Sequence, residues 1–198
     1  VIPYLEREHN IVFKNKKVLL VSAVDRFGLA ESLLAHGADI IFGDLLFGLG
    51  LPCPIKNFTY FTYLAKIVLP VLTKLPIKFF YPTGDKQNQI KPRFGQYFQE
   101  AQIIAGDFHF IKKNMPDNLK NKIIITNTVT PKDETLLQDR GVKTLVTTTP
   151  EMGGRSFGTN ILEGILVAYA GRGRSLSQAE YNALLDEINI KPRVKQLF

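Results

Sequence analysis

The chain has 198 residues, of which 45% are hydrophobic and 22% charged, and this balance excludes an intrinsically disordered chain. The single cysteine, Cys53, excludes an internal disulfide and a metal site built from several cysteines, and we expect it to be a buried, inert thiol. The formal net charge of +7 comes from scattered lysines and arginines, so we expect a small anionic metabolite as partner and no nucleic acid. Cysteine usage and the lack of a signal-peptide pattern predict a cytoplasmic protein.

Residues 1–15 predict a lead-in helix or linker. Its apolar side chains would pack on the edge of the next domain, and they are Leu5, Ile11 and Phe13. Residues 16–44 then predict a strand, a polar loop, a helix and a second strand. Apolar runs at 18–21 and 40–42 flank a helix-patterned segment that Gly37 ends. This order of elements opens a doubly wound α/β domain.

Residues 45–82 are strongly apolar, within an expected helical insertion at 45–95. Their charge-free runs are shorter than the ~20 residues that a membrane-spanning helix needs. We expect this segment to cover one face of the sheet and to form a homodimer interface. A third alternative, which we weigh below these two, places it on a membrane surface with its lysines outward.

The rest of the chain predicts three more strands, at 102–105, 122–125 and 142–146, with a helix at 92–100 before the first of them. Another helix begins at Thr130, which has the residue type of an N-cap. A helix at 161–170 follows. Ser177 and Glu180 have capping-box spacing at the start of a last helix, and the tail after it is extended.

These elements predict a Rossmann-like, doubly wound α/β domain at 16–175, with a mostly parallel five-stranded sheet, and a C-terminal helix and tail at 176–198. Right-handed crossovers predict that strands 1, 4 and 5 lie on one side of the switch point and strands 2 and 3 on the other. Because the chain starts at Val1 without an initiator methionine, we expect it to be the C-terminal part of a longer protein.

Polar residues follow every predicted strand. In a parallel sheet they would all lie at one edge, where ligands of this architecture bind. In chain order they are Ser22, Asp25, Arg26 and Gly28; Asp44; Asp107 and His109; Thr126, Asn127 and Thr128; and residues 147–149 with Glu151, Gly153, Gly154, Arg155, Ser156 and Asn160.

Asp44 ends the second strand, about twenty residues past the first turn, where a dinucleotide domain places the acid that binds ribose hydroxyls. A carboxylate there would favour NAD over NADP, while an ordinary turn aspartate is the structural alternative. The first turn carries only one glycine, Gly28, instead of the pattern G-x-G-x-x-G. Either the cofactor sits differently, with Arg26 and the helix terminus attracting its phosphate, or no dinucleotide binds.

Two further groups carry candidate chemistry. Residues 153–160 combine glycines, Arg155 and Ser156 before a helix, which suits a phosphate or carboxylate; the alternative is a flexible capped loop. Asp107 and His109 would share one face of an extended strand and form an acid/base pair; the alternative is an exposed histidine between two phenylalanines. The sequence shows no metal-binding motif.

Six segments carry a family resemblance: VLLVSAVDRFGLAESL, IIFGDLLFGLGLP, YPTGDKQ, AGDFHFI, ITNTVT and TTTPEMGGRSFGTNILEGILVA. They resemble a bacterial family described as quinate 5-dehydrogenase-like, which is distantly similar to the quinate/shikimate dehydrogenases. The resemblance runs from about Lys16 to Ala170. It implies an NAD(P)-binding domain of a dehydrogenase that acts on a small cyclic hydroxy acid. The lysine–aspartate substrate pair of the shikimate dehydrogenases belongs to an amino-terminal domain that is not in this sequence.

Our leading hypothesis is therefore an NAD(P)-dependent oxidoreductase with NAD or NADP as cofactor. The predicted cofactor-binding residues are Ser22, Arg26, Gly28, Asp44, Thr126, Asn127, Gly153, Gly154, Arg155 and Ser156, and the predicted catalytic residues are His109 and Asp107. The competing hypothesis is a non-redox Rossmann-like domain that binds a phosphorylated metabolite or a nucleotide-sugar.

Overall fold

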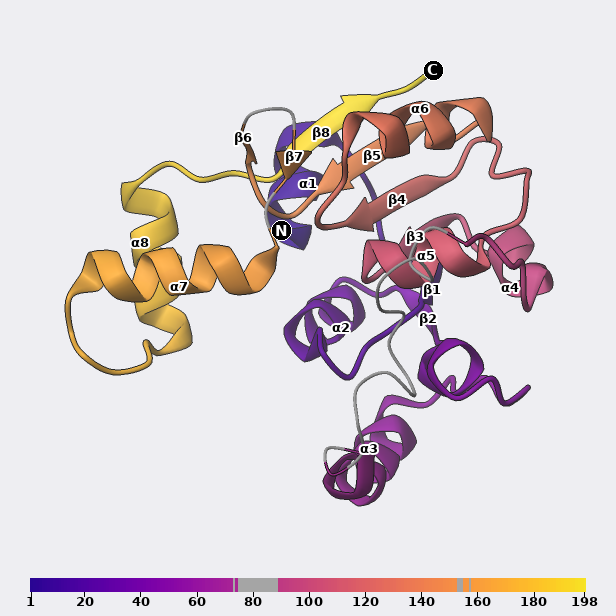
Figure 1. Cartoon of the computed structure of the whole chain (residues 1–198), viewed down its shortest axis with the longest axis horizontal. Helices are drawn as coiled ribbons and strands as arrows, with labels where there is room; N and C mark the ends of the chain where they lie inside the picture. Colours follow the sequence, from indigo (N-terminus) through magenta and orange to yellow (C-terminus); the bar gives the residue numbers. More distant parts are fainter. Residues whose placement is uncertain (73, 75–88, 153–154, 157) are drawn as a thin grey trace.

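The computed structural model describes residues 1–72, 74, 89–152, 155–156 and 158–198. Its centre is a six-stranded sheet with the order β2-β1-β3-β4-β5-β8 (Figure 1). The strands are β1 (Lys17–Leu20), β2 (Asp39–Phe42), β3 (Ile103–Ala105), β4 (Ile123–Thr126), β5 (Thr144–Thr147) and β8 (Arg193–Gln196). The first five are parallel and β8 is antiparallel to β5, so an α/β fold with a mostly parallel sheet is confirmed.

The sheet has one strand more than the five that we predicted. The tail forms β8, which pairs with β5 and adds a hydrogen bond from the Thr144 hydroxyl to Gln196 Oε1 at 2.8 Å. In the strand sequence RVKQ only Val194 is apolar, because an edge strand buries little surface. No hydrophobic run therefore marks it in the sequence.

The predicted strand order is wrong. β3 pairs with β1, where Val18 lies opposite Ile103, and not beside β2. Hydrophobic patterns locate strands but do not determine to which side a long connection crosses. The order 2-1-3-4-5 is the flavodoxin-like arrangement of doubly wound domains, and its switch point lies between β1 and β3.

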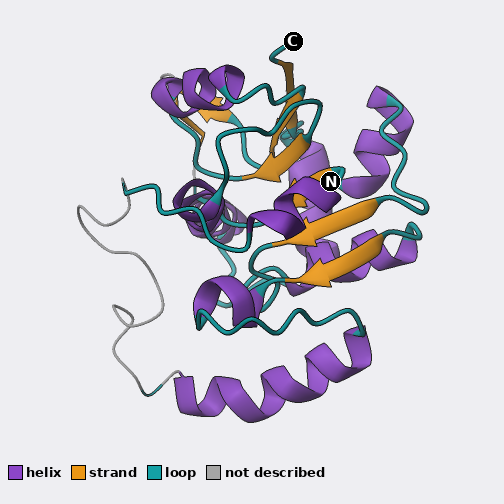
Figure 2. Cartoon of the chain, turned by 90° about the vertical axis from the view of Figure 1, so that its right-hand side faces the viewer, coloured by secondary structure: helices purple, strands orange, loops and turns teal. Residues whose placement is uncertain are grey.

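Helices cover both faces of the sheet (Figures 1 and 2). α1 (Ile2–His9) and α2 (Phe27–Ala35) pack on one face, and α4 (Gly95–Glu100), α5 (Phe108–Asn114) and α6 (Pro131–Asp139) pack on the other. α3 (Phe58–Leu72) joins the first face through Phe61. The expected caps are confirmed: Thr130 and Ser177 each begin a helix with a capping box.

Two sequence expectations about packing have opposite outcomes. The lead-in is confirmed as helical in its first part, and it belongs to the core: Ile2, Leu5 and Phe13 have no exposed surface. Cys53, expected to be buried, is exposed. It lies between Pro52 and Pro54 in the segment 49–54, which runs along the surface outside any helix or strand.

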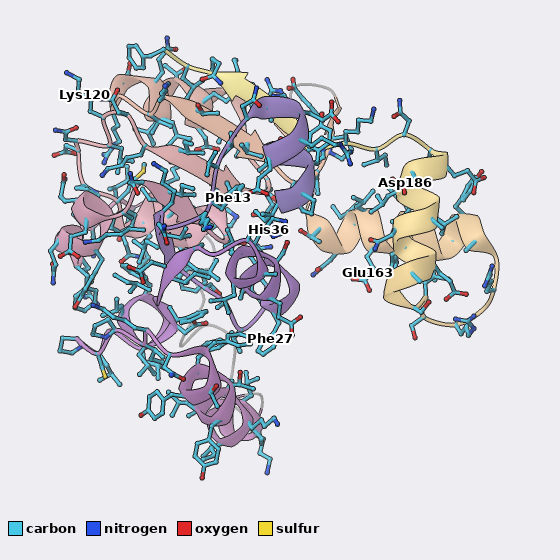
Figure 3. The ribbon with its side chains drawn as sticks, turned by 180° about the vertical axis from the view of Figure 1, so that it is seen from behind. Phe13, Phe27, His36, Lys120, Glu163 and Asp186 are labelled. Atoms are coloured by element: carbon cyan, nitrogen blue, oxygen red, sulfur yellow. The ribbon has the colours of Figure 1, made fainter. Side chains whose placement is uncertain are left out.

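The chain leaves the sheet after β5 and returns only at β8. It first forms a hairpin of β6 (Glu151–Met152) and β7 (Arg155–Ser156), then the helices α7 (Thr159–Ala170) and α8 (Gln178–Glu187). These two helices share a small core of their own around Leu162, Leu166 and Leu176. They project from the body of the molecule as an arm, on which Figure 3 labels Glu163 and Asp186.

Candidate functional site

The loops after β1 and β3 meet at the switch point of the sheet. Gly106, with φ +129°, follows β3, and a Cβ added to it would lie 2.6 Å from Val21 Cγ2 and 3.3 Å from the Ser22 nitrogen. Only glycine fits this conformation and this contact. The close approach brings the residues that follow β1 directly against those that follow β3.

An ion pair joins the two loops. Arg26 donates to Asp107 Oδ2 at 3.1 Å and also lies 3.7 Å from Asp25 Oδ2. Asp107 Oδ1 accepts the backbone N–H of His109 at 2.9 Å, so both of its oxygens have partners. Because the Arg26 side chain is only 14% exposed and faces two carboxylates, most of its charge is neutralised by the protein itself.

Asp44 lies at the end of β2 and begins a π-helical turn, η1 (Asp44–Gly48). Its Oδ1 accepts the backbone N–H groups of Ala23 at 2.9 Å and Val24 at 3.0 Å. Its Oδ2 is buried without a hydrogen-bond partner among the described residues. Burial, assisted by the nearby charge of Asp25, outweighs these hydrogen bonds and raises the pKa of Asp44 to about 6.

A cavity of about 240 Å³ opens between the ends of β1 and β2 and the inner side of α3. Its polar floor consists of Ser22, Asp25 and Asp44, with the Ser22 hydroxyl donating to Asp25 Oδ1 at 2.5 Å. The walls are apolar and include Leu45, Ile55, Phe61, Leu64, Val68 and Phe110. We call this cavity the α3 pocket. Apolar walls with a few polar groups on one side are typical of small-molecule sites.

Stacked phenylalanines hold α3 over the pocket. The rings of Phe42 and Phe61 are nearly parallel with centroids 4.7 Å apart, and Phe58 and Phe27 pack around them. Such pairs add stability beyond the area that they bury. The apolar segment after β2 therefore contributes a wall of the site, a role that our sequence interpretation missed although the apolar run marked the segment.

The carboxyl edge brings together only part of the predicted site. Ser22, Asp25, Arg26, Asp44 and Asp107 form one connected group at β1, β2 and β3. Near β4 and β5, two of the predicted polar side chains form hydrogen bonds to backbone groups of the protein itself. The Thr126 hydroxyl donates to the Gly106 carbonyl at 2.7 Å, and Ser156 Oγ accepts the Val129 N–H at 2.6 Å.

The remaining predicted residues have varied surroundings. Asn127 Oδ1 and Thr147 Oγ1 are buried without a partner in the described part of the chain. Thr128 has φ +37°, a strained value for a threonine. Asn160 lies exposed in α7, and Arg155 lies in β7. Gly153 and Gly154 lie outside the described residues.

The expected strand geometry of Asp107 and His109 is wrong. β3 ends at Ala105, Asp107 is the N-cap of α5 and His109 lies in the first turn of that helix. The carboxylate of Asp107 therefore accepts the backbone N–H of His109, and the two residues do not share one face of an extended strand. Among the described residues no cluster of three histidine, cysteine or acidic side chains is suited to a metal ion.

The sheet order, the switch point and the pocket at the carboxyl edge define a doubly wound α/β domain with a candidate small-molecule site. The chain belongs to a family described as "Domain of unknown function (DUF8754)", whose model matches residues 1–197. No curated protein and no solved structure matches the chain.

Proposed function

We propose that the chain is the NAD(P)-binding domain of a quinate/shikimate dehydrogenase-like enzyme, and that the α3 pocket receives the nucleoside part of the cofactor. The observation that supports this most directly is Asp44 at the end of β2: the residue lines the α3 pocket, and its Oδ2 is buried without a partner among the described residues. Dinucleotide-binding domains use an acid at this position to accept hydrogen bonds from ribose hydroxyls.

The pocket residues fit a nucleoside in two respects. Leu45, Ile55 and Phe61 offer apolar contacts to a flat base, and the carboxylate of Asp44 offers an acceptor to a sugar hydroxyl. Because a 2′-phosphate would be repelled by that carboxylate, we propose NAD rather than NADP. The nicotinamide would supply hydride transfer to or from a carbinol carbon, and His109 is our candidate for moving the proton.

The phosphates of the cofactor would bind without the usual glycine-rich turn, since Gly28 is the only glycine in the turn after β1. The N-terminus of α2 has no side-chain cap, and the space beside Gly28 is open, so backbone N–H groups at this helix end are available to an anion. Arg26 already holds Asp107 through Nη2, so it would join them with Nε, which is buried without a partner among the described residues, or by exchanging Asp107 for the ligand. We therefore propose that the nucleoside contacts contribute more of the affinity than the phosphate contacts.

A non-redox domain that binds a phosphorylated metabolite or a nucleotide-sugar is the second candidate. The strand order 2-1-3-4-5 favours it, because this arrangement is associated with a mononucleotide at the switch between β1 and β3. The single glycine of the first turn also favours a ligand with fewer phosphates than NAD. Both candidates use the same edge of the sheet.

Fluorescence titration of the protein with NADH and NADPH tests the leading proposal. We expect NADH to bind more tightly than NADPH, and Asp44→Asn to weaken NADH binding by about ten-fold or more, since a hydrogen bond to a charged group contributes about 1.5–3 kcal/mol. Asp39→Asn is the matched control: it makes the same change at the other end of β2, on the exposed amino edge.

If neither cofactor binds, the dehydrogenase proposal is rejected. Binding of UDP-glucose or of a sugar phosphate, measured by calorimetry, would then support the second candidate. If NADH binds but Asp44→Asn and Asp39→Asn behave alike, the cofactor does not contact Asp44 and the assignment of the nucleoside to the α3 pocket is wrong.

A further inference from the structure

The outward side of α3 carries large side chains that nothing in the described part of the chain covers. Tyr60, Tyr63 and Ile67 are 55%, 65% and 53% exposed. Their spacing of three and four residues places them in one stripe along the helix. The opposite stripe of the same helix lines the α3 pocket. Figure 2 shows α3 as the lowest helix, at the margin of the molecule.

The charged side chains of the segment that contains α3, residues 45–84, are all positive. Between Leu45 and Gly84 the sequence contains lysines but no aspartate and no glutamate. Lys56, Lys66 and Lys74 are exposed, and none of them forms an ion pair within the residues that the structure describes. The stripe is thus accompanied along the sequence by lysines that have no ion-pair partner in the part of the chain that the structure describes.

We propose that the outer side of α3 docks on the surface of an anionic lipid bilayer. Tyr60, Tyr63 and Ile67 enter the boundary between headgroups and acyl chains, where tyrosine is favoured, and the lysines contact lipid phosphates. The helix lies in the plane of the surface. Among the described residues no helix has the length and apolar character needed to traverse a bilayer.

The charge pattern favours a membrane over a second copy of the chain. A two-fold dimer through this side would bring α3 of each copy against the other, and with it Lys56, Lys66 and Lys74 of both. No acidic residue of the segment is present to compensate them. An anionic membrane instead attracts each lysine, with about 1 kcal/mol per basic residue near the surface.

The helix α7 in the arm can be compared with α3. α7 also has an exposed apolar stripe, formed by Ile161, Ile165 and Tyr169 with exposures of 55%, 49% and 60%. The charges around it have both signs: Glu163 lies on α7 and Asp186 on α8 (Figure 3), and Arg172 and Arg174 follow α7 and form ion pairs with Glu180. The exposed residues of the two stripes have similar exposed fractions, but the charges beside α7 are mixed and partly paired, whereas those beside α3 are all positive.

A tryptophan reporter tests the proposal, since the chain contains no tryptophan. Tyr63→Trp places the only indole on α3, and Tyr169→Trp places it on α7. We expect vesicles of phosphatidylserine and phosphatidylcholine to shift the Tyr63→Trp emission to the blue and brominated lipids to quench it. Vesicles of phosphatidylcholine alone should leave it unchanged, and Tyr169→Trp should respond to neither.

Charge variants test the lysines by co-sedimentation with the same vesicles. Lys56→Gln with Lys66→Gln should weaken binding by about five-fold per lysine at low salt. The control removes two lysines from the opposite, amino edge of the sheet, Lys120→Gln with Lys143→Gln, and should change binding by less than about two-fold. All four positions are exposed, and circular dichroism confirms that each variant is folded.

The proposal is overturned if the wild-type chain does not sediment with anionic vesicles, or if both lysine pairs matter equally. It is also overturned if Tyr63→Trp shows no emission shift. A dimer in analytical ultracentrifugation that Tyr63→Ser dissociates, without vesicle binding, would assign the outer side of α3 to a second copy. None of these results bears on nucleotide binding, so this proposal and the proposed function succeed or fail separately.

Discussion

The carboxyl group of Asp44 has its environment set by two segments that are far apart in the sequence. The loop after β1 donates two backbone N–H groups to Oδ1, while Oδ2 is buried without a partner among the described residues. Burial raises the pKa of Asp44 by more than the two hydrogen bonds lower it, so the pKa lies at about 6. Asp44 therefore stabilises the loop at Ala23 and Val24, and we propose that its carboxylate also accepts a hydrogen bond from a ligand hydroxyl.

This environment predicts a pH-dependent stability. The folded protein holds the Asp44 proton more tightly than the unfolded chain does, because the pKa rises from the usual 3.8 to about 6. The free energy of unfolding should therefore fall as the pH increases from about 4 to about 6, by up to about 3 kcal/mol from this group. Asp44→Asn, which keeps an acceptor for the two N–H groups, should lose this component of the slope.

Urea denaturation at both ends of that pH range measures the effect in the wild type, Asp44→Asn and Asp39→Asn. The exposed Asp39 serves as the reference for general effects of removing a carboxylate. An identical pH slope in all three proteins would contradict the buried environment that we describe for Asp44.

The sequence predicted that Asp44 follows the end of the second strand, but it did not predict the contacts of its carboxyl group. The apolar run of β2 followed by Gly43 is a local signal, and the structure confirms that the strand ends there. The contacts of Oδ1 depend on a loop about twenty residues earlier, and the apolar walls of the pocket that Asp44 lines come partly from α3. Such contacts between distant segments leave no pattern in the sequence around the residue itself.

At the scale of elements, the switch point depends on the close contact between the loops after β1 and β3. Gly106 allows this contact, and the Arg26–Asp107 ion pair is formed across it. The side chains of Arg26 and Asp107 are largely buried, so the ion pair contributes mainly by satisfying groups that have left water.

Gly106→Ala should destabilise the protein by about 3 kcal/mol, from backbone strain at φ +129° and from the 2.6 Å approach to Val21 Cγ2. Gly28→Ala is the comparison, because a Cβ there meets nothing within 4 Å and alanine is the better helix former; we expect up to about 1 kcal/mol of added stability. Thermal unfolding followed by circular dichroism measures both. Equal effects of the two substitutions would refute the close contact.

Elements with a strong local signal were predicted within about two residues, and those defined by tertiary contacts were not. Apolar runs marked β1 to β5, and caps marked α6 and α8. α5 was missed because its start depends on Asp107 acting as an N-cap, which we interpreted as part of an extended strand. β8 was missed because an edge strand needs little hydrophobic surface.

At the scale of the whole molecule, four regions of the described surface differ in their chemistry. The carboxyl edge of the sheet combines acidic groups with the α3 pocket, and the amino edge carries Lys16, Lys120 and Lys143 around a polar groove. The arm of α7 and α8 and the outer side of α3 expose apolar stripes. The net charge of +7 is therefore unevenly distributed, and the carboxyl edge, where we propose the nucleotide, is not its most basic part.

The sheet order is the whole-molecule property that the sequence could not provide. A long connection from residue 43 to residue 102 separates β2 from β3, and hydrophobic patterns are identical whether that connection crosses β1 or stays beside β2. The structural result moves the switch point to Arg26 and Asp107, and it separates the pocket at β1 and β2 from the polar residues at β4 and β5.

A crystal structure of the chain grown with NADH tests the central claim most directly. We predict electron density for the adenosine half between α3 and the ends of β1 and β2, with a ribose hydroxyl within hydrogen-bond distance of Asp44 Oδ2. Density for the nucleotide at any other place, or an α3 pocket that stays without it at saturating NADH, would contradict the account.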